Sequence, residues 1–118
     1  MEIKERVKYM ENLKTITNIV RAFLETEPKT RNSDSYLYLK VLEYVSKEEG
    51  FALSYMTVPY FLEHMKEYGF PPFESVRRTR QKLQQTYPEL AAADSVQIMR
   101  HDKEAVYLEY VRDVNHDI

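Results

Sequence analysis

The chain has 118 residues and carries 17 Lys and Arg against 19 Asp and Glu, a formal net charge of −2. This length suits one domain, and the near balance of charge excludes a global cationic field, so nucleic acid would have to bind a local patch. The sequence contains no cysteine, which excludes disulfides, thiol catalysis and thiolate metal sites.

Glycine is rare, with two in the whole chain, and tight hairpin turns draw on the positive φ that glycine supplies. We therefore expect a mostly α-helical fold of about five helices. The sequence has no cationic apolar leader and no apolar run long enough to span a bilayer. We expect a soluble cytoplasmic protein with no membrane partner.

The first helix is expected over residues 3–24, where apolar residues recur at the period of an amphipathic helix. They are Ile3, Val7, Met10, Leu13, Ile16, Val20 and Phe23. We treat residues 1–27 as a long amino-terminal element. Its stripe also approximates a heptad, which leaves two interpretations open: packing on the core of the domain, or pairing with a second copy in a homodimer. Pro28 and the polar residues up to Asn32 are interpreted as a linker.

A second helix begins where Ser33 or Asp34 caps it and ends at Gly50. Its inward stripe consists of Tyr38, Val41, Leu42 and Val45. Residues 51–56 form a short apolar run, and periodicity over so few residues does not distinguish a strand from a helical turn.

The third helix is short. Thr57 resembles its N-cap, Pro59 is tolerated in its first turn, and Gly69 ends it. Its apolar face consists of Phe61, Leu62, Met65 and Tyr68. The connection that follows, up to Pro72, is expected to be stiff because each proline fixes its own φ.

The fourth helix is expected over residues 73–86, closed by Tyr87 and Pro88. Residues 89–93 cross to a fifth helix, which Asp94 or Ser95 caps. Its stripe consists of Val96, Met99, Val106 and Tyr110. We expect the main helical domain to span residues 30–112 and residues 113–118 to form a flexible tail, because the tail has little apolar content.

Positive charge is concentrated on the fourth helix. Its cations are Arg77, Arg78, Arg80 and Lys82, against the single acid Glu74. A helical wheel places an outward arc opposite Val76 and Leu83. The candidate DNA-binding residues on that arc are Ser75, Arg77, Arg78, Gln81, Lys82 and Gln85. Arginine presents a fork to guanine or phosphate, glutamine addresses adenine, and lysine or serine holds the backbone. Arg80 falls at the edge of the apolar arc, and its role stays open.

The order of elements around the basic helix also indicates a DNA-binding motif. A short helix that ends at Gly69, a tight turn and then a basic helix follow the order of a helix-turn-helix. We therefore expect a helix-turn-helix-like core in which the third helix braces the fourth. The competing interpretation is a solvated basic face that acids from neighbouring elements balance.

The stretches TRNSDSYLYLKVLEYV (residues 30–45) and GFPPFESVRRTRQKLQQTYPELA (residues 69–91) resemble small uncharacterised proteins encoded by phages and integrated elements of Gram-positive bacteria. The resemblance covers roughly residues 30–112. Its most specific piece consists of Ser75, Arg77, Arg78, Arg80, Gln81 and Lys82. It implies a helix-turn-helix or winged-helix-like unit, a phage or mobile-element origin, a bacterial host cell and a DNA-binding role. No pair of wing strands is expected after residue 86.

The sequence does not indicate a catalytic site, a metal site or a cofactor. His64, His101 and His116 lack the i, i+4 spacing that sets two imidazoles on one helix face for zinc. Glu63 and Glu67 lie one helical turn apart, beside basic neighbours, and are interpreted as a solvated face. No serine lies in a nucleophile elbow, and no glycine-rich loop is present to hold phosphates.

Two functions remain. The first is a non-catalytic, phage-type DNA-binding protein that reads the major groove with its fourth helix. The alternative is a mobile-element protein-binding module, such as an anti-CRISPR-type inhibitor of a host nuclease or defence complex. Its interface would use the acidic remainder of the chain and the tyrosines, which are enriched at protein interfaces.

Overall fold

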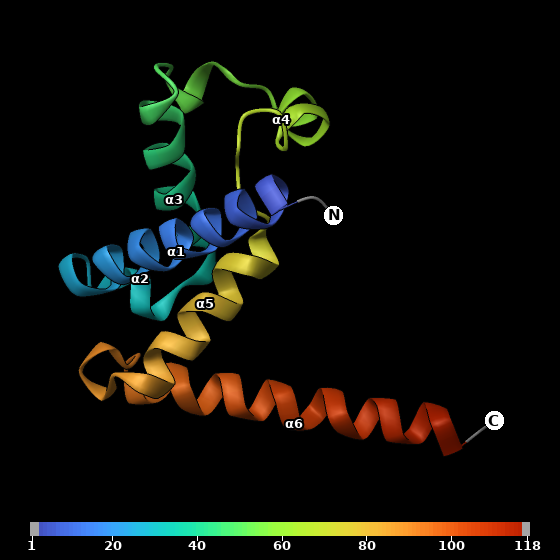
Figure 1. The fold of residues 1–118 in the computed structure, drawn as a ribbon. Helices are drawn as coiled ribbons and strands as arrows, with labels where there is room; N and C mark the ends of the chain where they lie inside the picture. Colours follow the sequence, from blue (N-terminus) through green and yellow to red (C-terminus); the bar gives the residue numbers. More distant parts are fainter. Residues whose placement is uncertain (1–2, 117–118) are drawn as a thin grey trace.

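The computed structural model describes the backbone of residues 3–116 and the side chains of residues 15–110 and of Arg112. The described chain is helical and contains no strand, which confirms the mostly α-helical prediction (Figure 1). The elements are α1 (Ile3–Thr26), α2 (Lys29–Asn32), α3 (Asp34–Glu48), α4 (Val58–His64), α5 (Phe73–Thr86) and α6 (Asp94–His116), with 3-10 turns η1 (Leu53–Tyr55) and η2 (Pro88–Leu90).

The segment interpreted as a linker is instead the helical turn α2. The buried hydroxyl of Thr30 has one proton to donate and lies within hydrogen-bonding distance of two carbonyls, those of Glu27 (2.6 Å) and Phe23 (3.0 Å). Arg31 Nε donates to the carbonyl of Leu24 (2.7 Å). These carbonyls belong to the last turn of α1 or follow it, where intrahelical partners run out. Polar side chains therefore hold the junction against α1. The polar composition of this segment did not predict that contact.

The core lies where α1, α3 and α5 pack against one another. Its buried residues are Val20, Leu24, Leu37, Val41, Val76, Leu83 and Leu90. In Figure 1, α1 runs across α3 and α5. Ile16 and Phe23 pack around the core, so the described part of the amino-terminal stripe serves core packing. Ile3, Val7, Met10 and Leu13 lie outside the described side chains, and a homodimer through this helix stays a prediction.

Local signals explain where α3 begins and ends. Ser33 is the N-cap, because its side chain accepts a hydrogen bond from the backbone N–H of Tyr36 at 3.2 Å. That leaves the carboxylate of Asp34 available for another contact. Gly50, at a φ of 87°, follows the end of the helix in a conformation that residues with a Cβ rarely adopt.

The run at 51–56 contains the 3-10 turn η1, which decides between a strand and a helical turn. The predicted cap of the next helix is confirmed, since Thr57 Oγ1 accepts a hydrogen bond from the N–H of Tyr60 at 3.3 Å. The expected end of this helix at Gly69 is wrong: α4 ends at His64, and the chain continues through turns to Gly69, whose φ is 76°.

α4 is not one of the main packing partners of α5, and the expected helix-turn-helix-like core stays a prediction. α5 packs mainly on α1 and α3, whereas α4 lies apart from α5, level with the carboxyl-terminal part of α3 in the view of Figure 1. The cause is the connection: Pro72 is extended (φ −64°, ψ 148°), and Phe70 and Pro71 are buried. The hydroxyl of Tyr38 on α3 donates to the carbonyl of Pro71 at 2.8 Å. The prolines thus hold α4 away from α5 instead of making a tight turn.

The last helix, α6, begins at Asp94 and extends away from the rest of the molecule (Figure 1). Side chains 101–110 are all exposed. The backbone of α6 is helical to His116, but side chains 113–118 lie outside the described set, so the flexible tail stays a prediction. No helix in the described part of the chain combines the length and apolarity needed to cross a membrane.

Candidate nucleic-acid interface on α5

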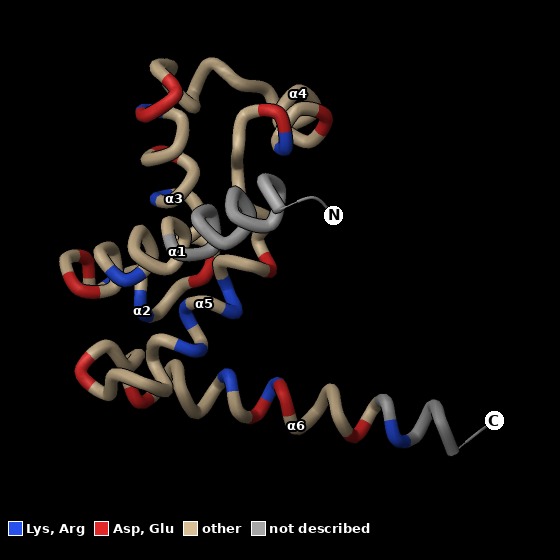
Figure 2. Tube along the Cα trace, viewed as in Figure 1, with Lys and Arg blue, Asp and Glu red and all other residues tan. Residues whose placement is uncertain are grey.

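Cationic and amide residues are concentrated on α5, and the blue segments of Figure 2 mark the positions of the cations along this helix. Arg78, Gln81, Lys82 and Gln85 are all exposed. Their spacing of i, i+3, i+4 and i+7 places them on one helix face. We call these four residues the outward stripe. The wheel prediction therefore holds for four of its six candidates.

Glu74 lies one helical turn before the outward stripe, and its carboxylate is hydrogen-bonded to two arginines. Its carboxylate accepts from Arg77 Nε (3.0 Å) and Nη2 (2.6 Å), and from Arg78 Nε (3.2 Å). The hydrogen bond from Arg77, helped by its charge and by Arg78, lowers the pKa of Glu74 from 4.5 to about 2. Arg77 has a raised pKa in return, chiefly from the same hydrogen bond. At neutral pH this carboxylate orients both guanidinium groups and offsets part of their charge.

Two of the predicted contact residues flank the stripe instead of lying on it. Ser75 is half-buried and lines a pocket beneath α1 with Ile16 and Ile19, so it faces the helical body. Arg77 is also half-buried. A wheel drawn for an isolated helix assigns both to the outer arc, because it does not include the width of the neighbouring helix.

Arg80 has a structural role. Its side chain is almost buried, and its guanidinium donates from Nε to Asp34 Oδ1 (2.8 Å) and from Nη2 to Asp34 Oδ2 (2.9 Å). A bidentate arginine–carboxylate pair combines charge with fixed geometry. It therefore joins α5 to the first turn of α3. The signal in the sequence was the position of Arg80 at the edge of the apolar arc.

Further polar contacts extend this pair into a network. Gln84 accepts from Arg80 Nη1 (3.3 Å) and donates to the carbonyls of Arg31 (3.2 Å) and Leu90 (3.0 Å). Arg100 of α6 donates to the same Arg31 carbonyl at 3.2 Å. Burial, followed by the charge of Arg80, lowers the pKa of Arg100. The Asp34 network (Asp34, Arg80, Gln84 and Arg100) thus connects α2, α3, α5 and α6.

The start of α6 borders the stripe on one side. A pocket of about 380 Å³ lies between the two helices, and its lining includes Gln81 and Gln85 from α5 and Gln97, His101 and Glu104 from α6. A ligand that lies on the stripe would also meet this part of α6. The sequence did not indicate this neighbour, because no local pattern specifies which helix lies beside which.

The histidines were not predicted to bind metal. His64 of α4 lies near Glu63 on the same helix (Nε2–Oε2 3.8 Å) and near Glu67 in the turn that follows (Nδ1–Oε2 3.1 Å), and His101 is exposed on α6. The side chain of His116 lies outside the described residues. Among residues whose side chains are described, no cluster of three carboxylate, imidazole or thiolate groups could hold a metal. The expectations of no metal, no cofactor and no catalysis stay predictions.

Together these features define a small all-helical protein with a core of three packed helices and an exposed basic face. No protein-family model, curated protein or solved structure matches the chain. The phage or mobile-element origin therefore stays a prediction.

Proposed function

We propose that this protein is a non-catalytic DNA-binding protein that places the outward stripe of α5 in the major groove. The supporting observation is the joint exposure of Arg78, Gln81, Lys82 and Gln85 on one face of a helix anchored from behind. An α-helix fits the major groove, where arginine and glutamine address base edges and lysine addresses phosphates.

The observed packing changes which helices would support the recognition helix. α5 acts as the recognition helix, while α1 and α3 take the supporting role that the third predicted helix was expected to fill. The Asp34 network supports the proposal physically, because a helix that reads base edges must be held at a fixed angle to its scaffold. A winged version has no counterpart in residues 3–116, where no strand occurs.

The experiment is a fluorescence-anisotropy titration with labelled duplex DNA between about 50 and 200 mM salt. We expect affinity to fall with salt, because bound cations release counterions from the phosphates. The variant Arg78→Ala/Lys82→Ala should bind more weakly and reduce the salt slope by about one unit for each phosphate that is no longer bound. Both positions are exposed, so the fold should persist, as a circular-dichroism melt would check.

A charge-matched control is Lys29→Ala/Lys47→Ala, which removes the same number of cations from exposed positions on α2 and α3. We expect this control to bind DNA nearly as the parent does. If the parent shows no salt-sensitive binding, or both double variants lose affinity equally, the stripe is not a specific DNA contact surface.

The exposed apolar side chains of α6 support a second candidate function, that of a protein-binding module. These side chains include Val106 (65% exposed), Tyr107 (65%), Leu108 (57%) and Tyr110 (67%). An exposed apolar surface of this kind is typical of an interaction site, and a helix without tertiary packing is only marginally stable in water. The partner under this proposal is a host protein or a nucleoprotein complex.

The two candidates are separated by capture from bacterial lysate with and without nuclease treatment. If the protein binds its partner through α6, we expect a captured protein that is retained after nuclease treatment. Capture should be lost with Val106→Ser/Tyr110→Ser but not with Arg78→Ala/Lys82→Ala. The opposite pattern supports DNA binding. A species retained equally by both variants would support neither surface.

A further inference from the structure

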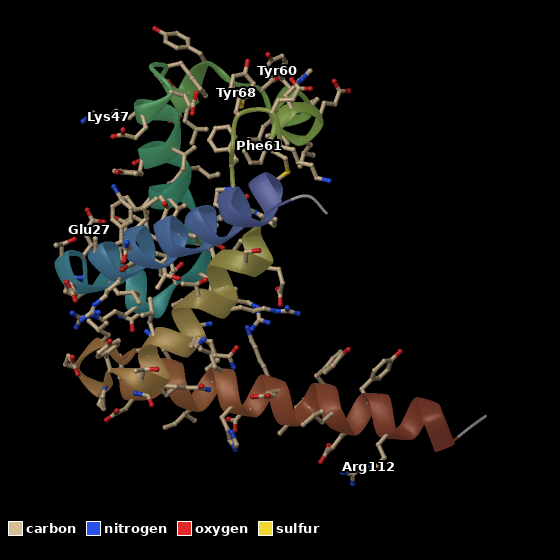
Figure 3. All side chains as sticks on the ribbon, in the orientation of Figure 1. Glu27, Lys47, Tyr60, Phe61, Tyr68 and Arg112 are labelled. Carbon is tan, nitrogen blue, oxygen red and sulfur yellow. The ribbon has the colours of Figure 1, made fainter. Side chains whose placement is uncertain are left out.

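An aromatic pocket lies at the end of the molecule that is remote from α5. It has a volume of about 430 Å³ and is lined by Phe51, Tyr55, Met56, Thr57, Tyr60 and Tyr68. The η1 segment, α4 and the turn after α4 each contribute to this lining. Figure 3 shows Tyr60 and Tyr68 close together in this region. Neither the DNA-binding proposal nor the α6 proposal uses this pocket.

Two walls of the aromatic pocket are held in place. The hydroxyls of Tyr60 and Tyr68 are hydrogen-bonded at 2.7 Å, and the ring of Phe51 meets that of Tyr68 edge-on at a centroid distance of 5.2 Å. Phe51 also lies 6.2 Å from the ring of Phe70, which is buried. The pocket is therefore built on side chains that connect to the body of the protein, so its shape is largely formed in advance.

Other rings of the aromatic pocket face water. Tyr55 is 88% exposed and Tyr60 is 42% exposed. Tyrosines that serve only to fill a core would bury most of their rings. The pocket thus presents aromatic surface to solvent in a concave arrangement.

The surroundings of Tyr60 include one imidazole and two carboxylates. His64 packs against the Tyr60 ring at 4.3 Å and lies near the carboxylates of Glu63 and Glu67. The pKa of Tyr60 is raised, first by its hydrogen bond with Tyr68, then by desolvation and the charge of Tyr68, and least by the negative charge of Glu67. Lys66 lines a different pocket, beneath α1. Aromatic rings beside a carboxylate attract a cation and disfavour an anion.

We propose that the aromatic pocket binds an organic cation, an alkylated ammonium group held against Tyr55, Tyr60 and Tyr68 with Glu67 as the nearby counter-charge. Clustered aromatic rings recognise such groups because the ring quadrupole attracts the charge while the methyl groups fill apolar space. A free trimethylammonium compound and a methylated lysine side chain share this chemistry.

The first experiment compares choline with 3,3-dimethylbutan-1-ol, which has nearly the same shape but no charge. Binding is followed by NMR chemical-shift changes of the pocket residues, with sodium chloride added to match ionic strength. We expect choline to bind about 2- to 30-fold more tightly, the range that a cation–aromatic contact supplies. Equal or tighter binding of the neutral alcohol would overturn the proposal, since the pocket would then be merely apolar.

Variants locate the effect. Tyr55→Leu keeps an apolar side chain but removes the aromatic ring, and the fold should persist because Tyr55 is exposed. We expect Tyr55→Leu and Glu67→Gln each to weaken choline binding, and Tyr55→Phe to retain it. Tyr107→Leu, at another exposed tyrosine on α6, is the matched control and should bind as the parent does. Choline binding that Tyr55→Leu leaves unchanged would contradict the proposed site.

A second arm distinguishes the sources of the cation. A peptide that carries trimethyl-lysine is compared with the same peptide carrying unmodified lysine and with free choline. Tighter binding of the methylated peptide than of choline assigns the pocket to a modified protein, whereas equal binding assigns it to a small molecule. If neither ligand shifts the pocket resonances at millimolar concentration, the proposal is wrong.

Discussion

Arg80 of α5 and Asp34 of α3, which are 46 residues apart in the sequence, form a two-pronged ion pair with N–O distances of 2.8 and 2.9 Å. The Arg80 side chain is 8% exposed and that of Asp34 is 22% exposed. The pair is the clearest reason why α5 has a fixed orientation on α3, and it thereby directs the outward stripe towards solvent.

Replacing Arg80 with Ala should destabilise the protein by about 3 kcal/mol, near the low end for a broken buried pair because Asp34 retains some solvent contact. Urea unfolding measures this change in stability. The double variant Arg80→Ala/Asp34→Ala should cost less than the sum of the two single variants, because it leaves no unpaired charge. Additive effects would mean that the two side chains do not stabilise the fold through each other.

Glu74→Gln should increase DNA affinity under the proposed function. The substitution removes a negative charge that currently engages Arg77 and Arg78, and both arginines become freer to meet phosphates. The salt slope should steepen by up to about one unit for each additional phosphate that is bound. Anisotropy titration of the parent and the variant checks this result, with Glu89→Gln, an exposed acid in η2, as the control. Unchanged or weaker DNA binding would contradict the placement of the interface.

The Glu74 carboxyl should titrate with a pKa of about 2 instead of 4.5, chiefly because Arg77 hydrogen-bonds to its ionised form. A lowered carboxyl pKa means that this interaction stabilises the fold fully above pH 4.5, and that the stabilisation disappears as the pH falls through about 2. Carbon-detected NMR titration of the side chain measures this midpoint. Arg77→Gln should return the midpoint towards 4.5, and a midpoint that stays low in this variant would assign the shift to another group.

Thr30→Val should destabilise the protein by about 1–2 kcal/mol, because it keeps the shape of a buried side chain but removes a hydroxyl that lies within hydrogen-bonding distance of two carbonyls. Thr26→Val is the matched control. The Thr26 hydroxyl donates to the Ala22 carbonyl at 2.7 Å, but this residue is exposed and water can replace the hydrogen bond. Urea unfolding of both variants should show the larger destabilisation at residue 30. Equal effects would argue against a structural role for the α1–α2 junction.

Several elements followed from local chemistry and were therefore readable in the sequence. The α5 boundaries at residues 73 and 86 match the expected ones, because Pro72 directly precedes the helix and Pro88 restricts the backbone of Tyr87 just after it. The Thr57 cap and the glycines that follow α3 and α4 are also local features. The exposure of Arg78, Gln81, Lys82 and Gln85 followed from helical periodicity alone.

Tertiary structure decided the features that depend on which segments meet. The helical wheel placed Arg80 at the edge of the apolar arc and left its role open, whereas its contact with Asp34 gives it a structural role. The helical wheel placed Ser75 on the outer arc, but in the structure this residue lies on the side of α5 that faces the neighbouring helix α1. The position of α4, the turn at residues 29–32 and the grouping of tyrosines in the aromatic pocket are likewise set by distant contacts. Periodicity specifies the angle of a side chain around its own helix but not the neighbour that it meets, and burial and ion pairing depend on that neighbour.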